Sequence, residues 1–208
     1  MNYIAFPPKG GRWHAEGVTD EGEGRQNERS QTMWYVIWCI TGKESSFLDT
    51  IKRVVPKELY EKVWIPYRIK ISKYHGEEKE DLIRLFPGYI LLDTGDPEGV
   101  HMSLKGEKDY IGILKQEDRF TPISEDEKKI ISYFTGDNGV AGVSLGIKEN
   151  GKTRIIEGPL KGMDHMIVKV ERNKKRAWIK LHNFLGQDRE IPFALEMVDR
   201  DRESGKKA

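Results

Sequence analysis

The densest group of side chains able to bind an anion lies in residues 161–182, which read KGMDHMIVKVERNKKRAWIKLH. Seven Lys or Arg stand there against two acidic residues, a local charge of about +5 in a chain whose formal net charge is +1. Because Lys and Arg neutralise phosphates, this segment is a candidate nucleic-acid contact. Its candidate side chains are Lys161, His165, Lys169, Arg172, Asn173, Lys174, Lys175, Arg176 and Lys180.

The run RNKKR, residues 172–176, falls at a predicted hairpin turn, where side chains are displayed together. Trp178 and the nearby histidines have rings that can stack on unpaired bases. The alternative is a solvated hairpin with Trp178 in the core of a small barrel. The residue pattern leaves both interpretations open.

Residue patterns for covalent chemistry are missing from the sequence. The five histidines are scattered, without the spacing of metal ligands, and neither a Walker loop nor a nucleophile elbow occurs. The carboxylates fall mostly in solvated runs such as Glu77–Asp81. We therefore expect a binding protein and not an enzyme, with no catalytic residue, no metal site and no cofactor.

Composition indicates a reducing compartment. Cys39 is the single cysteine, so no internal disulfide can form, and its apolar surroundings WYVIWCI predict a buried, inert thiol. No stretch reaches the ~18–20 apolar residues of a membrane span. These features predict a cytoplasmic protein with no membrane partner.

A second informative stretch is LFPGYILL, residues 85–92, where a Pro-Gly pair interrupts an apolar run. Strict strand alternation would place Phe86 and Tyr89 on opposite faces. A bulge at Pro87-Gly88 adds a residue and shifts the phase, so both rings would point the same way. The sequence thus predicts a strand over residues 82–93 with a bulge that aims two aromatic rings at one surface.

The elements around these stretches predict a sheet with helices packed on it, in the order β-α-β-β-α-β-α. Strands are expected at residues 34–40, 63–72, 82–93 and 110–114, with a charged loop at 75–81. Thr41 and Glu44 have the spacing of a capping box for a helix that Pro56 ends, and Ser124 and Glu127 have the same spacing. Asp96-Pro97 opens the remaining helix.

Composition shifts divide the chain. Residues 1–32 are polar and predict a disordered extension, and residues 33–136 form the αβ domain. Residues 137–153 are Gly-rich and weakly patterned, which predicts a linker. Short strands and turn signals over residues 154–199 predict a small antiparallel barrel, followed by a charged tail, residues 200–208.

Together these motifs resemble a known family. WYVIWCITGKE, LFPGYILL and TPISEDE resemble the N-terminal domain of NusG-type transcription elongation factors. IIEGPLKGMDHMIVKVERNKKRAWIKL resembles their KOW motif, and the resemblance covers Met33 to about Asp199. It implies an α+β protein, with an antiparallel four-stranded N-terminal sheet covered by helices and a C-terminal all-β, SH3-like KOW barrel.

The resemblance also implies partners. The N-terminal domain would grip the clamp helices of RNA polymerase through an aromatic cavity that maps onto Trp34, Tyr35, Phe86, Pro87, Gly88 and Tyr89. The tip of the charged segment, His75, Gly76 and Glu77, is a candidate second polymerase contact across the cleft. Such binding would disfavour pausing or termination, and the chain would act as a monomer.

Two departures from the family pattern bear on the remaining partners. His165 stands where a small residue is common, and Leu160 replaces the aromatic residue associated with Rho or ribosomal-protein contact. With the basic turn, they favour a specialised antiterminator of the LoaP type whose KOW domain binds a structured leader in nascent RNA. The alternatives are a general NusG that couples polymerase to Rho or the ribosome, and a ribosome-associated KOW protein that binds RNA.

Overall fold

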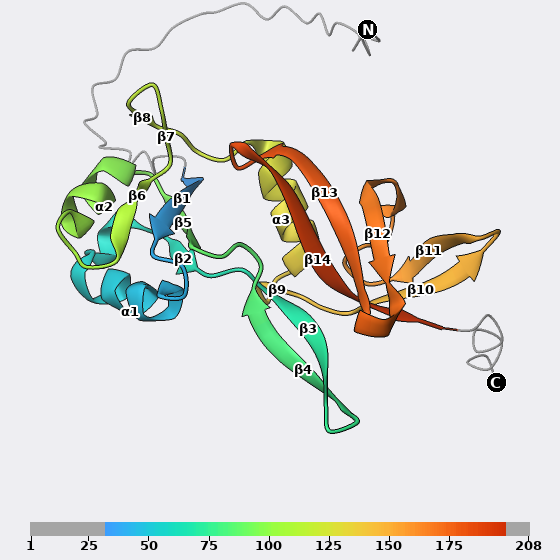
Figure 1. Cartoon of the computed structure of the whole chain (residues 1–208). Helices are drawn as coiled ribbons and strands as arrows, with labels where there is room; N and C mark the ends of the chain where they lie inside the picture. Colours follow the sequence, from blue (N-terminus) through green and yellow to red (C-terminus); the bar gives the residue numbers. More distant parts are fainter. Residues whose placement is uncertain (1–31, 199–208) are drawn as a thin grey trace, which may run out of the picture.

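The computed structural model describes residues 32–198, so the predicted N-terminal extension and charged tail lie outside the described residues (Figure 1). The N-terminal domain contains a four-stranded sheet in the order β2-β5-β1-β6, whose pairings are all antiparallel, as expected. Its strands are β1 (Met33–Cys39), β2 (Lys62–Trp64), β5 (Tyr89–Thr94) and β6 (Tyr110–Ile113).

Two helices, α1 (Glu44–Val54) and α2 (Pro97–Leu104), pack on one face of this sheet with the short helix η1 (Lys57–Leu59) (Figure 1). The Asp96 side chain caps α2, as predicted, by accepting from the Gly99 amide. The predicted capping box at the start of α1 is wrong, because α1 begins at Glu44 and lacks a side-chain cap. The Glu44 carboxylate is buried and serves a different loop, described below.

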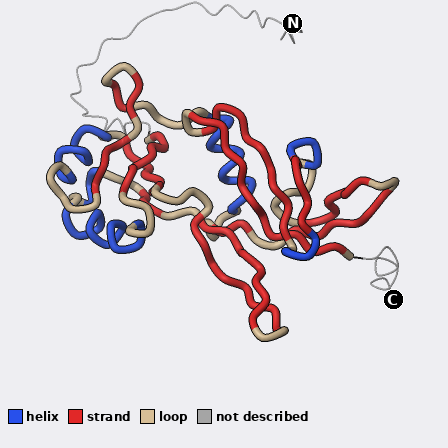
Figure 2. Tube along the Cα trace, in the orientation of Figure 1, coloured by secondary structure: helices blue, strands red, loops and turns tan. Residues whose placement is uncertain are grey.

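Residues 77–81 of the segment predicted as a charged loop lie in a strand of a projecting hairpin, and residues 75–76 form its turn (Figures 1 and 2). Strand β3 (Tyr67–Tyr74) pairs antiparallel with β4 (Glu77–Arg84), and β3 also pairs in parallel with β9 (Val140–Ala141). The charged strand is held by its backbone pairing with β3, and its exposed side chains form ion pairs, as in Lys73–Glu78 and Lys79–Asp81. Pro66 separates β2 from β3, which the sequence predicted as one strand.

The C-terminal domain is a five-stranded sheet in the order β11-β10-β14-β13-β12. Its strands are β10 (Ser144–Glu149), β11 (Lys152–Glu157), β12 (Ile167–Glu171), β13 (Arg176–Phe184) and β14 (Gln187–Met197). The short helices η2 (Asp164–Met166) and η3 (Arg172–Lys174) flank β12. All neighbours pair antiparallel except β10 and β14, which are parallel.

The predicted linker, residues 137–153, is wrong over most of its length. Strand β9 joins the hairpin sheet, and β10 pairs with both β11 and β14. Hydrophobic periodicity did not predict β10, because one of its core positions is occupied by glycine: Gly146 packs closely against the side chains of Leu195 and Ile155. The C-terminal domain therefore begins at Ser144 and not at residue 154.

Helix α3 (Glu125–Thr135) lies beside β13 and β14 (Figure 1) and begins with the predicted capping box of Ser124 and Glu127. The small hairpin of β7 (Lys115–Gln116) and β8 (Arg119–Phe120) precedes it. Phe134 of α3 contacts Phe193 of β14, with ring centroids 4.7 Å apart. Side chains of α3 therefore form part of the hydrophobic core of the C-terminal domain.

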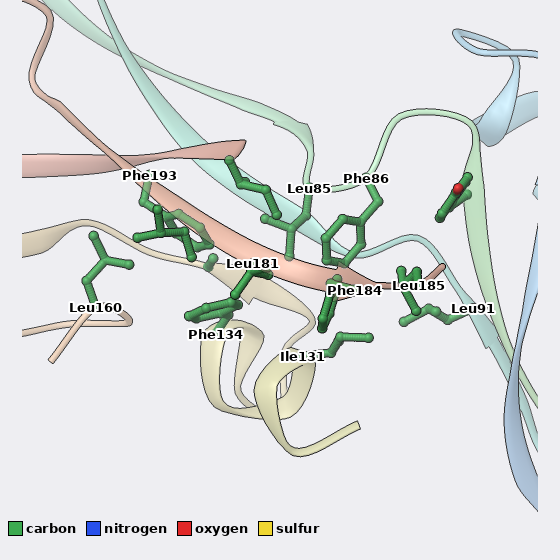
Figure 3. Packing of buried hydrophobic residues seen from close by; sticks show 14 of the residues in the cluster. Leu85, Phe86, Leu91, Ile131, Phe134, Leu160, Leu181, Phe184, Leu185 and Phe193 are labelled. Carbon is green, nitrogen blue, oxygen red and sulfur yellow. The ribbon is translucent and has the colours of Figure 1, made fainter. Parts of the chain in front are cut away.

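One hydrophobic cluster runs through both domains (Figure 3). It joins Leu85, Phe86 and Leu91 of the N-terminal domain to α3 and to Leu181, Phe184 and Phe193 of the C-terminal sheet. A second cluster lies under α1 and α2. The two faces of β1 explain the division: Val36 faces the shared cluster, whereas Tyr35 and Ile37 face the helices.

Because the domains share a core, we predict that they unfold together. Replacing Phe134 with Ala should lower the free energy of unfolding by about 3–5 kcal/mol, the usual cost of truncating a buried Phe. Urea denaturation followed by circular dichroism measures this change. In the control, Tyr74→Ala at the exposed hairpin tip, a change within about 0.5 kcal/mol is expected. Equal losses in the two variants would contradict the shared core.

Candidate interaction site

Residues Phe86–Tyr89 form a tight turn between β4 and β5, not a bulge within a strand. The Tyr89 amide donates to the Phe86 carbonyl across 3.2 Å, and Gly88 has a φ of 83°. Pro followed by a residue with positive φ is the arrangement of a type II turn. The predicted bulge is therefore wrong, because residues 85–88 are not in a strand of the described structure.

A buried carboxylate holds this turn. The Gly88 amide donates to Glu44 Oε1 at 2.7 Å, and Arg84 Nε lies 3.3 Å from Glu44 Oε2. Burial by itself would raise the pKa of Glu44, but backbone amides of Gly88, Gly42 and Glu44, together with Arg84, outweigh it and lower the pKa. A Cβ on Gly88 would lie 3.0 Å from Thr41 Oγ1. Glycine is needed here for both its φ and its small size.

The turn brings the predicted aromatic residues onto one face. Phe86 and Tyr89 belong to the same cluster as Val36, and Trp34 packs against that cluster. Tyr35 does not join them, because it alternates to the opposite face and lies in the core below the helices. The expectation that both rings of the FPGY stretch face one way is thus met by a turn.

Sequence reasoning missed Trp38, which stacks on Tyr89 with ring centroids 5.8 Å apart and planes 13° apart. It is 37% exposed. Period-two spacing from Trp34 along β1 could have placed it on this face. Trp34 itself packs edge-on against Trp64 at 4.6 Å and donates from its indole to Asp93.

The C-terminal domain covers this aromatic face. Phe86 and Phe184 point toward each other from the two domains, with ring centroids 5.6 Å apart (Figure 3). The Arg189 guanidinium lies 4.5 Å from the centroid of the Tyr89 ring. As a result Phe86 is 1% and Tyr89 8% exposed.

Polar contacts join the edge of the same interface. The Tyr89 hydroxyl accepts from Gln187 Nε2 at 3.1 Å and from Arg189 Nη2 at 2.5 Å. The Leu185 amide donates to Glu127 Oε1 at 2.6 Å, while the other oxygen of this carboxylate caps α3. The capping residue of α3 therefore also links α3 to the C-terminal sheet.

His75 and Gly76 form the exposed turn between β3 and β4, and Glu77 is the first residue of β4. The β3–β4 hairpin projects from the rest of the molecule (Figure 1). His75 and Gly76 both have positive φ, at 50° and 87°, which suits a tight two-residue turn. The structure does not bring this tip together with the aromatic residues. The two predicted polymerase contacts are separate surfaces.

The predicted nucleic-acid residues do not form one patch. Lys169 and residues 172–176 lie around the η3 turn. His165 and Lys180 line a separate hollow of about 390 Å³, and Lys161 is not among the residues that line it. Lys175, with a left-handed φ of 46°, forms ion pairs with Glu78 of the hairpin and with Glu196. Lys180 pairs with Asp188 at 3.7 Å.

Glu171 organises the basic turn. Its carboxylate accepts from Arg176 and from the Trp178 indole, and it lies within 3.7 Å of Lys169 and Lys174. Hydrogen bonds from Arg176 and Trp178 lower the pKa of Glu171 to about 2. Trp178 is half-buried on the outer face of β13, because its neighbours Ala177 and Ile179 fill the core. The interpretation that places Trp178 in the barrel core is therefore wrong.

Other chemistry is sparse in the described part of the chain. Residues 32–198 contain no group of three or more His, Cys, Asp or Glu arranged to hold a metal. None of their helices combines the length and apolar character that crossing a membrane requires. Cys39 is buried, as predicted, and burial raises the pKa of its thiol to about 12.

The Glu44 contacts lead to a pH prediction. Its pKa is lower in the folded protein, so the charged carboxylate adds stability above pH 4.5, the ordinary value, and this stability is lost as pH falls through the folded pKa. Glu44→Gln should cost about 1–3 kcal/mol at pH 7 and show a smaller loss of stability between pH 6 and pH 3. Urea titrations at several pH values test this, with exposed Glu61→Gln as the control. An unchanged pH dependence in Glu44→Gln would refute the role of Glu44.

Comparison with known proteins agrees with this architecture. Residues 32–132 match the family model described as "Transcription termination factor nusG". Curated relatives named "Transcription termination/antitermination protein NusG" include one from Pseudomonas aeruginosa, 24% identical over 78% of this chain and 94% of the relative. Another, from Halalkalibacterium halodurans, is 24% identical over 81% of this chain and 97% of the relative.

A solved structure described as "Domain interaction in Thermotoga maritima NusG" has a similar fold, with a TM-score of 0.51 and 18% identity. The similarity covers 79% of this chain and 93% of that one. The family match coincides with the N-terminal sheet, its helices and most of α3. Residues 32–132 thus match the NusG family model, and most of the chain is similar to proteins named transcription termination/antitermination protein NusG.

Proposed function

We propose that this chain binds the clamp helices of RNA polymerase through its N-terminal aromatic face and suppresses pausing or termination. The observation that carries the proposal is that Trp34 of β1 lies on the same face as Phe86 and Tyr89, at the Glu44-held turn. Aromatic residues are favoured at the centres of protein interfaces because they bury large areas. This is binding work, and it requires no covalent chemistry.

Polymerase binding at this face requires the C-terminal domain to move aside. Phe86 and Tyr89 are almost fully covered by Phe184 and Arg189. The apparent affinity for polymerase is then reduced by the fraction of molecules that are open. A partner that favours the open form would therefore activate the factor.

The second part of the proposal is that the basic turn around η3 contacts nascent RNA. Arg172, Asn173 and Lys174 are exposed there, next to the half-buried Trp178. A turn that displays cations beside an aromatic ring suits contact with phosphates and bases. This supports a specialised antiterminator that reads a structured leader.

Leu160 favours the specialised role over general coupling to Rho or the ribosome. It is 0% exposed and packs in the core shared by the two domains. The position where the family commonly presents an aromatic residue to those partners is therefore internal in this arrangement. We propose a cytoplasmic monomer whose main partners are polymerase and RNA.

Substitutions in the aromatic face and in the C-terminal domain that covers it should change polymerase affinity in opposite directions. Tyr89→Ala should weaken binding about tenfold or more, because it removes a central aromatic contact, a loss of ~2 kcal/mol. Arg189→Ala should strengthen binding several-fold, because it loosens the cover while leaving the face intact. Titration of core RNA polymerase with labelled full-length protein measures both. The control is Arg53→Ala on the exposed side of α1.

If Tyr89→Ala binds polymerase as well as Arg53→Ala does, the aromatic face is not the binding site. If Arg189→Ala binds no better than the unsubstituted protein, the C-terminal domain does not limit access to the face.

The transcriptional effect has its own test. In single-round transcription across a terminator, the full-length protein should increase readthrough, and a structured leader upstream should enhance the increase. Lys174→Ala should lose the enhancement by the leader and keep the basal effect. Increased termination on both templates would contradict an antiterminator, and equal readthrough with and without the leader would contradict recognition of RNA.

A further inference from the structure

A cleft lies between the β3–β4 hairpin of the N-terminal domain and the outer face of β13 and β14, with a volume of about 670 Å³. Six of its fifteen lining residues are Lys or Arg, and none is Asp or Glu. The cations come from both domains, namely Arg68, Lys70 and Lys73 from β3, and Lys174, Lys175 and Arg176 from the basic turn and β13. The cleft is therefore positively lined and exists only while the domains are docked.

The floor of the cleft contains apolar surface. Trp178 pairs opposite Pro192 in the β13–β14 register, so both lie on the outer face of the sheet, and Ile69 and Ile71 come from the hairpin. The Arg176 guanidinium lies 5.1 Å from the centroid of the Trp178 ring. Cations around an aromatic ring are the combination with which proteins bind single-stranded nucleic acid.

The charges inside the cleft are unequally neutralised. Lys175 is held by Glu78 and Glu196, which braces the hairpin against the C-terminal domain. Arg68 differs, because its buried Nε lacks a hydrogen-bond partner among the described residues. Burial, and then the charge of Arg176, lower the pKa of Arg68 to about 10. Two guanidinium groups from different domains thus repel each other at a place where an anion would be stabilised.

We propose that this cleft binds a segment of single-stranded nucleic acid, with phosphates between the hairpin and the basic turn and a base stacked on Trp178. The inference rests on the proposed RNA contact of the turn and extends that site onto the N-terminal hairpin. Because the ligand contacts both domains, it stabilises the docked form. A single strand that spans both walls of the cleft then opposes polymerase binding at the aromatic face, since each favours a different arrangement of the domains. A structured leader bound by the basic turn alone, as in the proposed antitermination, contacts one domain only and leaves the domains free to open.

The test uses the full chain and a fluorescein-labelled 12-nucleotide RNA, with DNA of the same sequence and inorganic phosphate as competitors. Two exposed cleft cations are replaced, Lys70→Gln on the hairpin and Lys174→Gln on the turn. Lys52→Gln on α1 and Lys152→Gln on β11 are matched controls, one in each domain and both outside the cleft. Binding is measured by fluorescence anisotropy at several salt concentrations.

Each cleft variant should lose RNA affinity about 3- to 10-fold. Each should also reduce the slope of the logarithm of the binding constant against the logarithm of the salt concentration by about 0.7, as expected for one lost phosphate contact to a single strand. Trp178→Leu should lose about tenfold or more. The controls should bind as the unsubstituted protein does. DNA that competes as well as RNA assigns the cleft to single strands of either kind, whereas weaker competition by DNA assigns it to RNA.

The outcomes separate this inference from the proposed function. If Lys174→Gln weakens binding and Lys70→Gln does not, the turn binds RNA alone and the shared cleft is wrong. If neither variant weakens binding, the RNA contact of the turn is wrong as well. Competition by millimolar phosphate equal to that of the unlabelled RNA would also overturn the inference, because it would show a simple anion site.

A charge-neutral variant tests the need for docked domains. Phe184→Ser loosens the apolar contact with Phe86, outside the cleft, and leaves every cleft cation in place. We expect it to weaken RNA binding several-fold and to strengthen polymerase binding, with folding checked by circular dichroism. Unchanged RNA affinity in the folded variant would contradict a shared cleft, and if the variant does not fold, the comparison of Lys70 and Lys174 decides.

Discussion

The buried carboxylate of Glu44 is the constraint on which the domain arrangement depends. It accepts from the Gly88 amide and pairs with Arg84, and so fixes the turn that joins the hairpin to the central strand β5. The turn directs Phe86, and the pairing of β5 with β1 directs Tyr89. Their rings contact Phe184 and Arg189, so the Glu44 carboxylate, at the first residue of α1, supports a turn that lies at the contact between the two domains.

The aromatic face of the N-terminal domain is apolar and is covered when the two domains dock. A sheet face carrying Trp34, Val36, Phe86 and Tyr89 would be a large exposed apolar patch if nothing covered it. The C-terminal domain and α3 bury it within a core that continues through both domains. The same burial hides the surface that we propose for polymerase, so under that proposal the apolar area that stabilises this arrangement also limits polymerase binding.

Acidic residues have a positioning role throughout the molecule. Glu171 gathers Lys169, Lys174, Arg176 and the Trp178 indole, and Glu78 reaches from the hairpin to Lys175. A chain of nearly balanced charge can in this way hold cations in a local arrangement without becoming a polycation. The cleft between the domains is positively lined because its described lining residues include six Lys or Arg and no Asp or Glu, although Glu78, Glu171 and Glu196 pair with several of these cations.

The sequence by itself determined the α+β class, most of the strands and helices, the capping box of α3 and the aromatic character of residues 85–92, because these depend on local periodicity and local hydrogen bonds. Local signals misled where a distant partner decided the outcome. Glu44 accepts from the Gly88 amide instead of completing the expected capping box. The Gly-rich segment contains β10 because β11 and β14 pair with it. Trp34 and Tyr35, expected to share one cavity, lie on opposite faces of β1. Only the tertiary structure placed Arg189 over Tyr89 and brought Arg68 and Arg176 into one cleft, since the proximity of residues about a hundred positions apart leaves no trace in local spacing.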